Sequence, residues 1–284
     1  MKRFITFSSR GKVVKAMASV SAVIKNLRPF EGRAYVALIG LALFMNLPEA
    51  GPEKLITAFI AGVFFVWYAF SINNCFDVDT DSLNPVKARK NPVASGELTL
   101  KEGLVLSGLL ATAGMALAFT LNREAFAVYA LMTALATLYS APPRLKARPV
   151  VDVLSHGLFF GGLPFLYGAL VDGSLSRAEV WITVAVTFYS FALELRNHLG
   201  DYESDLKAGL RTTPVVIGKG KSEVLVDIFS LLAIGIVLYT LTPPMAVLSS
   251  LVVAKRGLDI DSKTAYRAFD AAMSAVLLLA GGGS

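Results

Sequence analysis

Two short polar patterns with the same spacing contain the residues of this sequence that are best suited to chemistry. Each pattern is an asparagine followed by aspartates at the fourth and eighth positions after it. The first motif is Asn73, Asp77 and Asp81, and the second motif is Asn197, Asp201 and Asp205. Residues four apart on a helix share one face, with Cβ atoms about 5–6 Å apart. The spacing therefore predicts a row of oxygen ligands on each of two helices.

These oxygen ligands favour a hard metal ion. Carboxylate and amide oxygens suit Mg²⁺, and the single cysteine and two histidines offer no softer cluster. We predict that all six motif residues bind Mg²⁺ and that the four aspartates are catalytic. Without cations, like charges about 4 Å apart would repel by roughly 4 kcal/mol at an effective dielectric constant near 20. Metal ions and an anionic substrate should therefore bind interdependently.

Basic residues that could bind phosphate follow both motifs and also lie between them. Arginine offers phosphate a rigid fork of donors and lysine a point charge, so both would stabilise a leaving diphosphate. The predicted diphosphate-binding residues are Asn73, Arg89, Lys90, Arg144, Lys146, Asn197, Lys207 and Arg211. Lys146 is also predicted to be catalytic, together with Tyr139. Tyr139 either orients the substrate or metal site, or belongs to an aromatic belt at a membrane interface.

The elements that must position these residues are apolar helices. Of the 284 residues, 55% are hydrophobic and 17% charged, and the mean hydropathy is +0.60. A soluble domain has about 25% charged residues, whereas about 20 apolar residues span a bilayer. The predicted spanning segments are roughly 33–47, 55–74, 100–121, 125–140, 151–171, 180–195, 224–241, 245–253 and 266–280. We therefore predict an all-α integral membrane protein of nine transmembrane helices, forming one domain over residues 1–284.

The distribution of charge gives the orientation of these segments. The net charge is +6, but the basic residues punctuate apolar runs, so we expect no nucleic-acid partner. When alternate loops are assigned to opposite faces, only Lys54, Arg123 and Arg177 fall outside the basic face. Basic loops are cytoplasmic in membrane proteins. We therefore predict a multi-pass protein of the cell membrane, with a cytoplasmic N-terminus and both motifs towards the cytoplasmic face.

The two ends of the chain are expected to lie outside the helical bundle. Residues 1–28 have apolar positions at helical spacing, which predicts a basic amphipathic segment on the membrane surface with Lys25 facing anionic headgroups. Residues 281–284 are interpreted as an expression scar. Cys75 is interpreted as a small buried hydrophobe.

At the motif residues the chain resembles the UbiA family of intramembrane prenyltransferases. The resemblance covers both motifs, the Tyr-Ser…Lys segment at 139–146, the Asn-Pro…Ser-Gly stretch at 91–96, the Arg-Thr-Thr-Pro stretch at 211–214 and the nine-helix layout. It implies a helical bundle around a central cavity that opens towards lipid and is capped on the cytoplasmic side. It also implies two Mg²⁺ ions that bridge the motifs to the diphosphate of a polyprenyl donor.

The resemblance further implies the reaction. A polyprenyl group is transferred from an isoprenyl diphosphate, such as geranylgeranyl diphosphate, to a lipophilic acceptor, which is an aromatic quinone precursor or an ether-lipid glycerophosphate. Metal ions and basic groups would stabilise the departing diphosphate while the allylic chain becomes carbocation-like. Aromatic side chains would shield this cation from water. The candidates are Phe65, Trp67, Phe70, Tyr129 and Phe160.

Parts of the sequence also fit two other functions, and several further titratable residues have alternative roles. A transporter with a parallel internal repeat is the alternative function, although its acids would be expected at mid-span and not at helix ends. A phosphotransferase of the CDP-alcohol type is disfavoured because no D-G-x-x-A-R run is present. Glu194 either pairs locally with His198 or takes part in catalysis. His156 is interpreted as a packing residue and Asp152 as a helix start.

Overall fold

The secondary structure of the described chain is entirely helical. The computed structural model describes residues 20–47, 49–241, 267, 270 and 271, and contains no strand among them. The long helices are α2 (Pro29–Met45), α3 (Pro52–Phe76), α6 (Leu100–Phe119), α7 (Arg123–Ser140), α10 (Arg177–Lys207) and α12 (Lys219–Leu241). One further pass consists of α8 (Val151–Gly157), the π-helical turn η2 (Leu158–Gly162) and α9 (Leu163–Ala169). The short helices are α4 (Val78–Asp81), α5 (Pro85–Lys90), η1 (Leu145–Ala147) and α11 (Thr213–Ile217).

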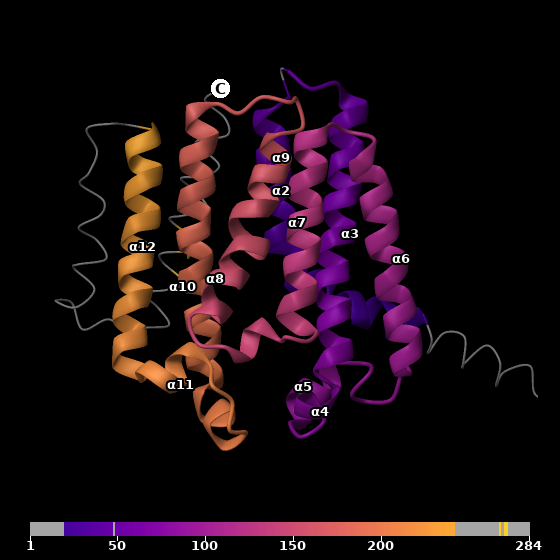
Figure 1. The fold of residues 1–284 in the computed structure, drawn as a ribbon, viewed down its shortest axis with the longest axis vertical. Helices are drawn as coiled ribbons and strands as arrows, with labels where there is room; N and C mark the ends of the chain where they lie inside the picture. The colour runs from indigo at the N-terminus through magenta and orange to yellow at the C-terminus, as the bar shows by residue number, and fades with distance from the viewer. Residues whose placement is uncertain (1–19, 48, 242–266, 268–269, 272–284) are drawn as a thin grey trace, which may run out of the picture.

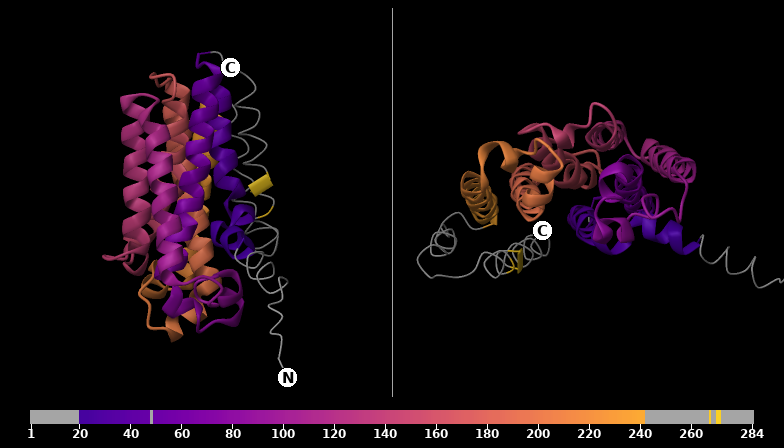
Figure 2. Two further views of the ribbon diagram at one scale, coloured as in Figure 1. Left: turned by 90° about the vertical axis from the view of Figure 1, so that its right-hand side faces the viewer. Right: turned by 90° about the horizontal axis from the view of Figure 1, so that it is seen from below.

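The long helices run side by side along the longest axis of the molecule, with α12 at one edge and α6 at the other (Figure 1). The short helices α4, α5 and α11 gather at the lower end in that view. The connections from α2 to α3, from α6 to α7 and from α9 to α10 lie at the opposite end. Figure 2 shows the same parallel packing from the side and from below. The loops that carry the predicted site residues therefore share one end of the bundle.

Local sequence signals fix where two of the long helices begin. Thr99 Oγ1 accepts a hydrogen bond from Glu102 N (3.2 Å), and the Glu102 carboxylate accepts one from Thr99 N (2.8 Å). Ser176 and Glu179 form the same reciprocal pair at the start of α10. Each of these capping boxes satisfies two amides that a helix terminus leaves without a partner. The registers of α6 and α10 are thus set locally.

Long helices of the described chain have the length and the apolar surface of a membrane protein. Four helices, α3, α6, α10 and α12, are long and apolar enough to cross a membrane. Large apolar side chains also cover the outside of the bundle, among them Leu109 (64% exposed) and Phe119 (74% exposed). Such a surface would be costly in water but suits hydrocarbon, since each helix satisfies its own backbone groups.

The first seven predicted segments correspond to α2, α3, α6, α7, the α8–η2–α9 pass, α10 and α12. The eighth segment and nearly all of the ninth fall outside the described residues. The total of nine helices, the cytoplasmic N-terminus and the central cavity remain predictions.

A hollow of about 460 Å³ in the described part of the chain is not the predicted cavity, because it lies on α6 and α7 away from both motifs. It is lined by Ala111, Thr112, Met115, Ala116, Phe119 and Phe126.

The α8–η2–α9 pass lies close to α10, because glycines with no side chain face that helix, among them Gly157 and Gly161. A Cβ atom on Gly157 would lie 2.0 Å from Phe191 Cδ1, and one on Gly161 would lie 2.5 Å from Ser190 Cβ. Small residues allow membrane helices to approach in this way. The approach brings the polar residues of α8, Asp152 and His156, within reach of α10.

Residues 20–27, the end of the predicted surface segment, are helical and pack on the protein. Ala22 lies in an apolar cluster with Cys75, Val93 and Leu98, and Cys75 is buried as predicted. Lys25 forms an ion pair with Glu97. The structure thus pairs Lys25 with a carboxylate of the same chain, and its contact with lipid headgroups stays a prediction. Residues 1–19 lie outside the described residues.

Candidate functional site

The two motifs lie at the same end of the bundle but on differently built helices. The second motif is in the continuous helix α10, as predicted. The first motif is not on one uninterrupted helix, since α3 ends at Phe76 and Asp77 caps it with φ −103° and ψ 7°. The four-residue spacing survives this break, because Asp77 N still bonds Asn73 O (3.0 Å) and Asp81 N bonds Asp77 O (2.8 Å).

Basic residues from the loop between α7 and α8 hold the first motif. Lys146 Nζ donates to Asn73 Oδ1 (2.8 Å) and also to Asp77 Oδ1. Arg144 Nη2 donates to the same Asp77 oxygen (3.0 Å), and Ser140 Oγ donates to Asn73 Oδ1 (3.2 Å). Four of the predicted site residues, Asn73, Asp77, Arg144 and Lys146, are thus in direct contact. Ser140 is a further contact that was not among the predicted site residues.

The environment of Lys146 makes its charge dependent on the first motif. Its side chain is 13% exposed and that of Asp77 is 15% exposed. Burial lowers the pKa of Lys146, and the neighbouring Asp77 carboxylate opposes that shift. A buried ammonium group is stable only when it is paired and hydrogen-bonded. Arg144 adopts φ 57°, an uncommon left-handed conformation for a residue other than glycine. The loop that presents Arg144 and Lys146 to the first motif therefore contains an unusual backbone turn.

The second motif is more open and is reached by a cation from the first motif's side. Lys87, in α5, donates to Asp201 Oδ2 at 3.2 Å, and the exposed fractions of the two side chains are 38% and 45%. This contact links residues that are 114 apart in the sequence. It places Asp201 opposite the loop that follows the first motif. Two acidic groups from separate helices, Asp77 and Asp201, are thus each paired with a basic group.

The last aspartate of each motif is buried and is held by a polar side chain from a proline-containing stretch that follows the motif. Asn91 Nδ2 donates to Asp81 Oδ2 (3.0 Å), and Thr212 Oγ1 donates to Asp205 Oδ2 (3.3 Å). Both aspartates are 7% exposed. Asn91 itself is fully buried and also donates to Asn74 O (2.9 Å). These two aspartates face inward to their supporting loops.

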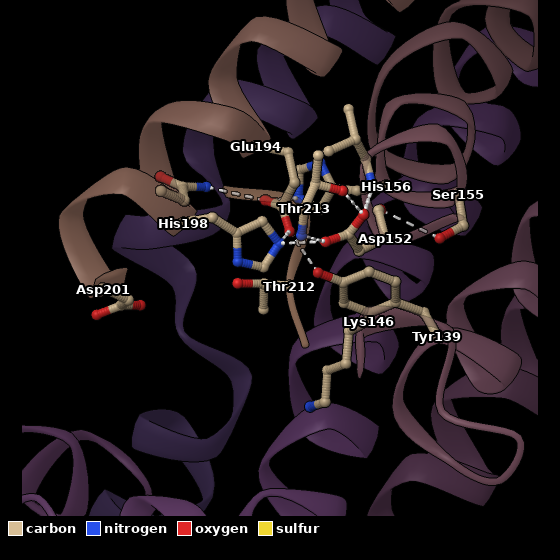
Figure 3. Close-up of polar contacts among 12 residues, drawn as sticks. Tyr139, Lys146, Asp152, Ser155, His156, Glu194, His198, Asp201, Thr212 and Thr213 are labelled. Carbon is tan, nitrogen blue, oxygen red and sulfur yellow. Dashed lines mark hydrogen bonds and ion pairs between the residues drawn. The ribbon is translucent and has the colours of Figure 1, made fainter. Parts of the chain in front are cut away.

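A network of titratable side chains lies behind the second motif, inside the bundle (Figure 3). Glu194 is 3.1 Å from His198 Nε2 and 3.3 Å from His156 Nε2, and it accepts a hydrogen bond from the Tyr139 hydroxyl. The Asp152 carboxylate is 3.6 Å from His198 Nε2. The predicted local pair of Glu194 and His198 is therefore confirmed. His156 packs among aromatic rings as predicted, and its ring centroid lies 5.2 Å from that of the Phe160 ring. It also contacts the Glu194 carboxylate.

The structure does not bring every predicted site residue to the motifs. Tyr139 points at Glu194 and not at a motif aspartate (Figure 3). Asn197 is exposed and its amide donates to Glu194 Oε2 (3.2 Å). Arg89 Nε donates to Pro85 O within its own helix. The side chains of Lys90, Lys207 and Arg211 are exposed at the same end of the bundle, and the ion pairs found among the described residues do not include them.

One further arginine stands near the motifs without having been predicted. Arg28 precedes α2 and lies over the Phe70 ring, 6.0 Å from its centroid. Burial lowers the pKa of Arg28, and Asp81, Glu31 and Asp77 oppose that shift. Its guanidinium therefore adds positive charge to the first motif. Its position just before a predicted span gave no sign of this, because the contact is made by folding.

The donor set of the first motif fits a hard cation. No group of three or more His, Cys, Asp or Glu side chains within the described ranges is arranged to hold a metal ion. The Lys146 ammonium nevertheless lies between an amide oxygen of Asn73 and a carboxylate oxygen of Asp77. The ammonium group of Lys146 is thus bound by the kinds of oxygen atom that Mg²⁺ prefers as ligands. The metal ligands stay a prediction, with Asn73, Asp77, Asn197 and Asp201 as the members that are not buried.

The supporting residues were missed although two of them lie in conspicuous stretches. Asn91 belongs to the Asn-Pro stretch and Thr212 to the Arg-Thr-Thr-Pro stretch. A small polar residue one or two positions before a proline, soon after an acidic motif, could have indicated a side chain that turns back to the acid. Lys87 sits in a basic run, and nothing in that run separates it from Arg89 and Lys90.

Comparison with known proteins shows where similar sequences and folds occur. Residues 34–258 match the UbiA prenyltransferase family. The chain is 29% identical to digeranylgeranylglyceryl phosphate synthase of Pyrococcus horikoshii over 70% of this chain and 69% of that protein. It is 31% identical to 4-hydroxybenzoate octaprenyltransferase of Polynucleobacter asymbioticus over 66% of this chain and 64% of that protein.

Solved structures share the fold. A UbiA homolog from Archaeoglobus fulgidus bound to GPP and Mg²⁺ has a TM-score of 0.71 with 22% identity, over 90% of this chain and 97% of that one. A structure of a digeranylgeranylglyceryl phosphate synthase has a TM-score of 0.72 with 19% identity, over 93% and 97% of the two chains.

Proposed function

Because this chain belongs to the UbiA prenyltransferase family, and is accordingly a prenyltransferase, we propose that it moves a polyprenyl group from an isoprenyl diphosphate to a lipophilic acceptor. The observation that carries this proposal is the pairing of Asp77 with Lys146 and Arg144, opposite Asp201 with Lys87. Acidic groups that bind metal ions and basic groups that bind phosphate are thus interleaved at one end of a membrane bundle.

The proposed donor is bound by its diphosphate at this end of the bundle. Arg144, Lys146 and Lys87 already lie on motif carboxylates, so small shifts of their side chains would bring them to phosphate oxygens. Structural relatives that share the fold are bound to GPP or DMAPP together with Mg²⁺, which supports the same class of donor here. The apolar tail would extend between the helices towards the aromatic side chains of the bundle.

Divalent ions, which we propose to be two Mg²⁺ held by residues of the two motifs, would supply positive charge to the diphosphate as it leaves. The side chains of Lys146 and Arg144 add fixed positive charge where negative charge grows, without needing to reorganise. The bond between the allylic carbon and the diphosphate oxygen breaks, and its electron pair leaves with the diphosphate. The acceptor oxygen or ring carbon then bonds to the allylic carbon and releases a proton.

Phe160 and its neighbours are suited to protect the allylic cation. Phe160 stacks on Tyr35 with ring centroids 4.2 Å apart, and Phe70 lies 5.5 Å from Phe160. Aromatic faces attract cations, and burial of this group excludes water that would capture one. Phe65 and Tyr129 are buried in the same core, where the Tyr129 hydroxyl is satisfied by Ala61 O.

The acceptor is proposed to be either a glyceryl phosphate ether or an aromatic quinone precursor. The two relatives named above transfer to these two classes according to their names. We further propose that the active site faces the cytoplasm, since the basic loops share its end of the bundle.

The test is a prenyl-transfer assay on the purified protein in detergent. Geranylgeranyl diphosphate and Mg²⁺ are supplied with a panel of glycerophosphate and hydroxybenzoate acceptors, and diphosphate release and product mass are followed. Acceptor-dependent release that EDTA abolishes and Mg²⁺ restores is the expected result, and the productive acceptor identifies the class. Release that persists in EDTA would contradict the metal assignment. Absence of both donor binding and product would contradict the proposed function.

A further inference from the structure

A fully buried carboxylate with three hydrogen bonds lies outside both motifs. Asp152, at the start of α8, is 0% exposed. Its Oδ2 accepts a hydrogen bond from Thr213 N (2.7 Å), and its Oδ1 accepts one from the Thr213 hydroxyl and one from Val153 N (2.8 Å). The start of α8 is thereby joined to the start of α11, 61 residues later. We call this joint the Asp152–Thr213 clasp.

The Thr213 hydroxyl also satisfies a strained part of the backbone. Val150 N donates to Thr213 Oγ1 at 2.7 Å. Val150 has φ 71° and ψ −48°, a conformation that β-branched residues rarely adopt. Such a conformation persists only where neighbouring groups hold it. Thr213 therefore determines the shape of the last residue in the loop that runs from α7 to α8.

The segments joined by the clasp each carry groups of the candidate site. The loop from 141 to 150 carries Arg144 and Lys146, which lie on Asp77 of the first motif. The residue before Thr213 is Thr212, which holds Asp205 of the second motif. The clasp is thus the described side-chain link between the loop that supplies cations to one motif and the loop that supports the other.

A reaction that depends on charge placement is sensitive to such a link. Misplacement of a reacting or stabilising group by about 1 Å can cost about 100-fold in rate. Simple attachment of α8 to the bundle needs no buried carboxylate, because Gly157 and Gly161 already let the α8–η2–α9 pass contact α10 closely. A costly buried charge at this joint therefore points to precise placement of the loop.

We propose that Asp152 and Thr213 are positioning residues, which fix the loop carrying Arg144 and Lys146 in register with the second motif so that both motifs act on one diphosphate. This inference rests on the proposed function. Asp152 itself contacts neither the proposed substrate nor a predicted metal ligand. It acts by holding the 141–150 loop, which carries Arg144 and Lys146.

The experiment compares Thr213→Val, which removes the hydroxyl but keeps the shape, with Thr213→Ser, which keeps the hydroxyl. Thr183→Val is the matched control, because the Thr183 hydroxyl donates only to Glu179 O of its own helix in the described contacts (2.8 Å). Wild type and variants are assayed for donor KM, kcat and the fraction of folded protein. Hydrogen–deuterium exchange of the 141–150 peptide is measured in parallel.

Thr213→Val is expected to lower kcat/KM for the donor by about 10- to 100-fold per folded molecule and to speed exchange at 141–150. Thr213→Ser should recover activity to within about 3-fold, and Thr183→Val should change neither readout. Asp152→Asn, which keeps one acceptor for Thr213 N, should fall between wild type and Thr213→Val.

Unchanged kcat/KM per folded molecule in Thr213→Val, or no recovery in Thr213→Ser, would overturn the proposal. Should Thr213→Val fail to fold, the comparison of Asp152→Asn with wild type decides in the same way. If the wild type shows no prenyl transfer but Thr213→Val still exchanges faster than wild type at 141–150, the clasp holds the loop and the proposed function is wrong. The two failures are thus distinguishable.

Discussion

The two motifs have the same residues at the same spacing, yet the structure surrounds them differently. Asp77 of the first motif is 15% exposed and touches two cations, whereas Asp201 of the second is 45% exposed and touches one. Behind the first motif stands a chain of buried amides, and behind the second a cluster of histidines and carboxylates. The repeated pattern therefore determines which side chains each motif contains. The segments packed against each motif determine how many charged groups surround those side chains.

The largest expected effect concerns the accessible aspartates of the two motifs. We expect Asp77→Asn and Asp201→Asn each to lower kcat/KM by about 10²–10³-fold, since each removes negative charge that binds cations at the leaving diphosphate. Initial rates at saturating Mg²⁺ measure this. Asp79→Asn is the control, because Asp79 is exposed and lies off the motif face. A near-normal rate in either motif variant would show that one motif suffices.

The next effect compares the cations of the two motifs. Lys146→Ala is expected to lower kcat/KM by about 100-fold and Lys87→Ala by about 10-fold. Lys146 is more buried, with 13% of its side chain exposed against 38% for Lys87, so water replaces it less well. Donor titrations with both variants measure the difference. Equal losses would mean that the buried environment of the first motif adds nothing to catalysis.

A smaller effect concerns the supports of the last aspartates. Asn91→Ala is expected to destabilise the protein by about 1–3 kcal/mol, because it leaves the buried Asn74 carbonyl and the Asp81 carboxylate without a donor. Thr212→Val removes one longer hydrogen bond, 3.3 Å, and should cost about 1 kcal/mol or less. Thermal unfolding in one detergent compares them. A larger loss in Thr212→Val would reverse the ranking of the two supports.

The smallest effect tests the docking of residues 20–27 beside the first motif. Lys25 lowers the pKa of the Glu97 carboxylate through a hydrogen bond. A carboxylate with a lowered pKa in the folded state adds stability above its ordinary pKa, and this stability is lost as the pH falls. Lys25→Ala should therefore cost less than about 1 kcal/mol near pH 7, and the difference from wild type should vanish in acid. A difference that grows in acid would contradict the pairing.

The apolar segments and the chemistry of the motifs were predictable because both depend on residue type and local spacing. Seven predicted segments of the described chain are helices of the bundle, and four predicted site residues, Asn73, Asp77, Arg144 and Lys146, lie in contact at one end of it. The remaining diphosphate candidates stay exposed in this structure, since a basic residue near a motif can point to solvent equally well. The direction in which a long basic side chain points depends on which groups of other segments lie opposite it after folding.

Sequence by itself determined that this protein is a helical membrane protein with two acidic motifs, because hydrophobic length and four-residue spacing are local properties of the chain. The prenyltransferase activity came from the resemblance of these motifs to the UbiA family. Only the tertiary structure decided that Lys87 crosses to Asp201 and that Thr213 meets Asp152. These contacts join residues 114 and 61 positions apart. The second contact satisfies the fully buried Asp152 carboxylate, and both exist only because folding brings distant segments together.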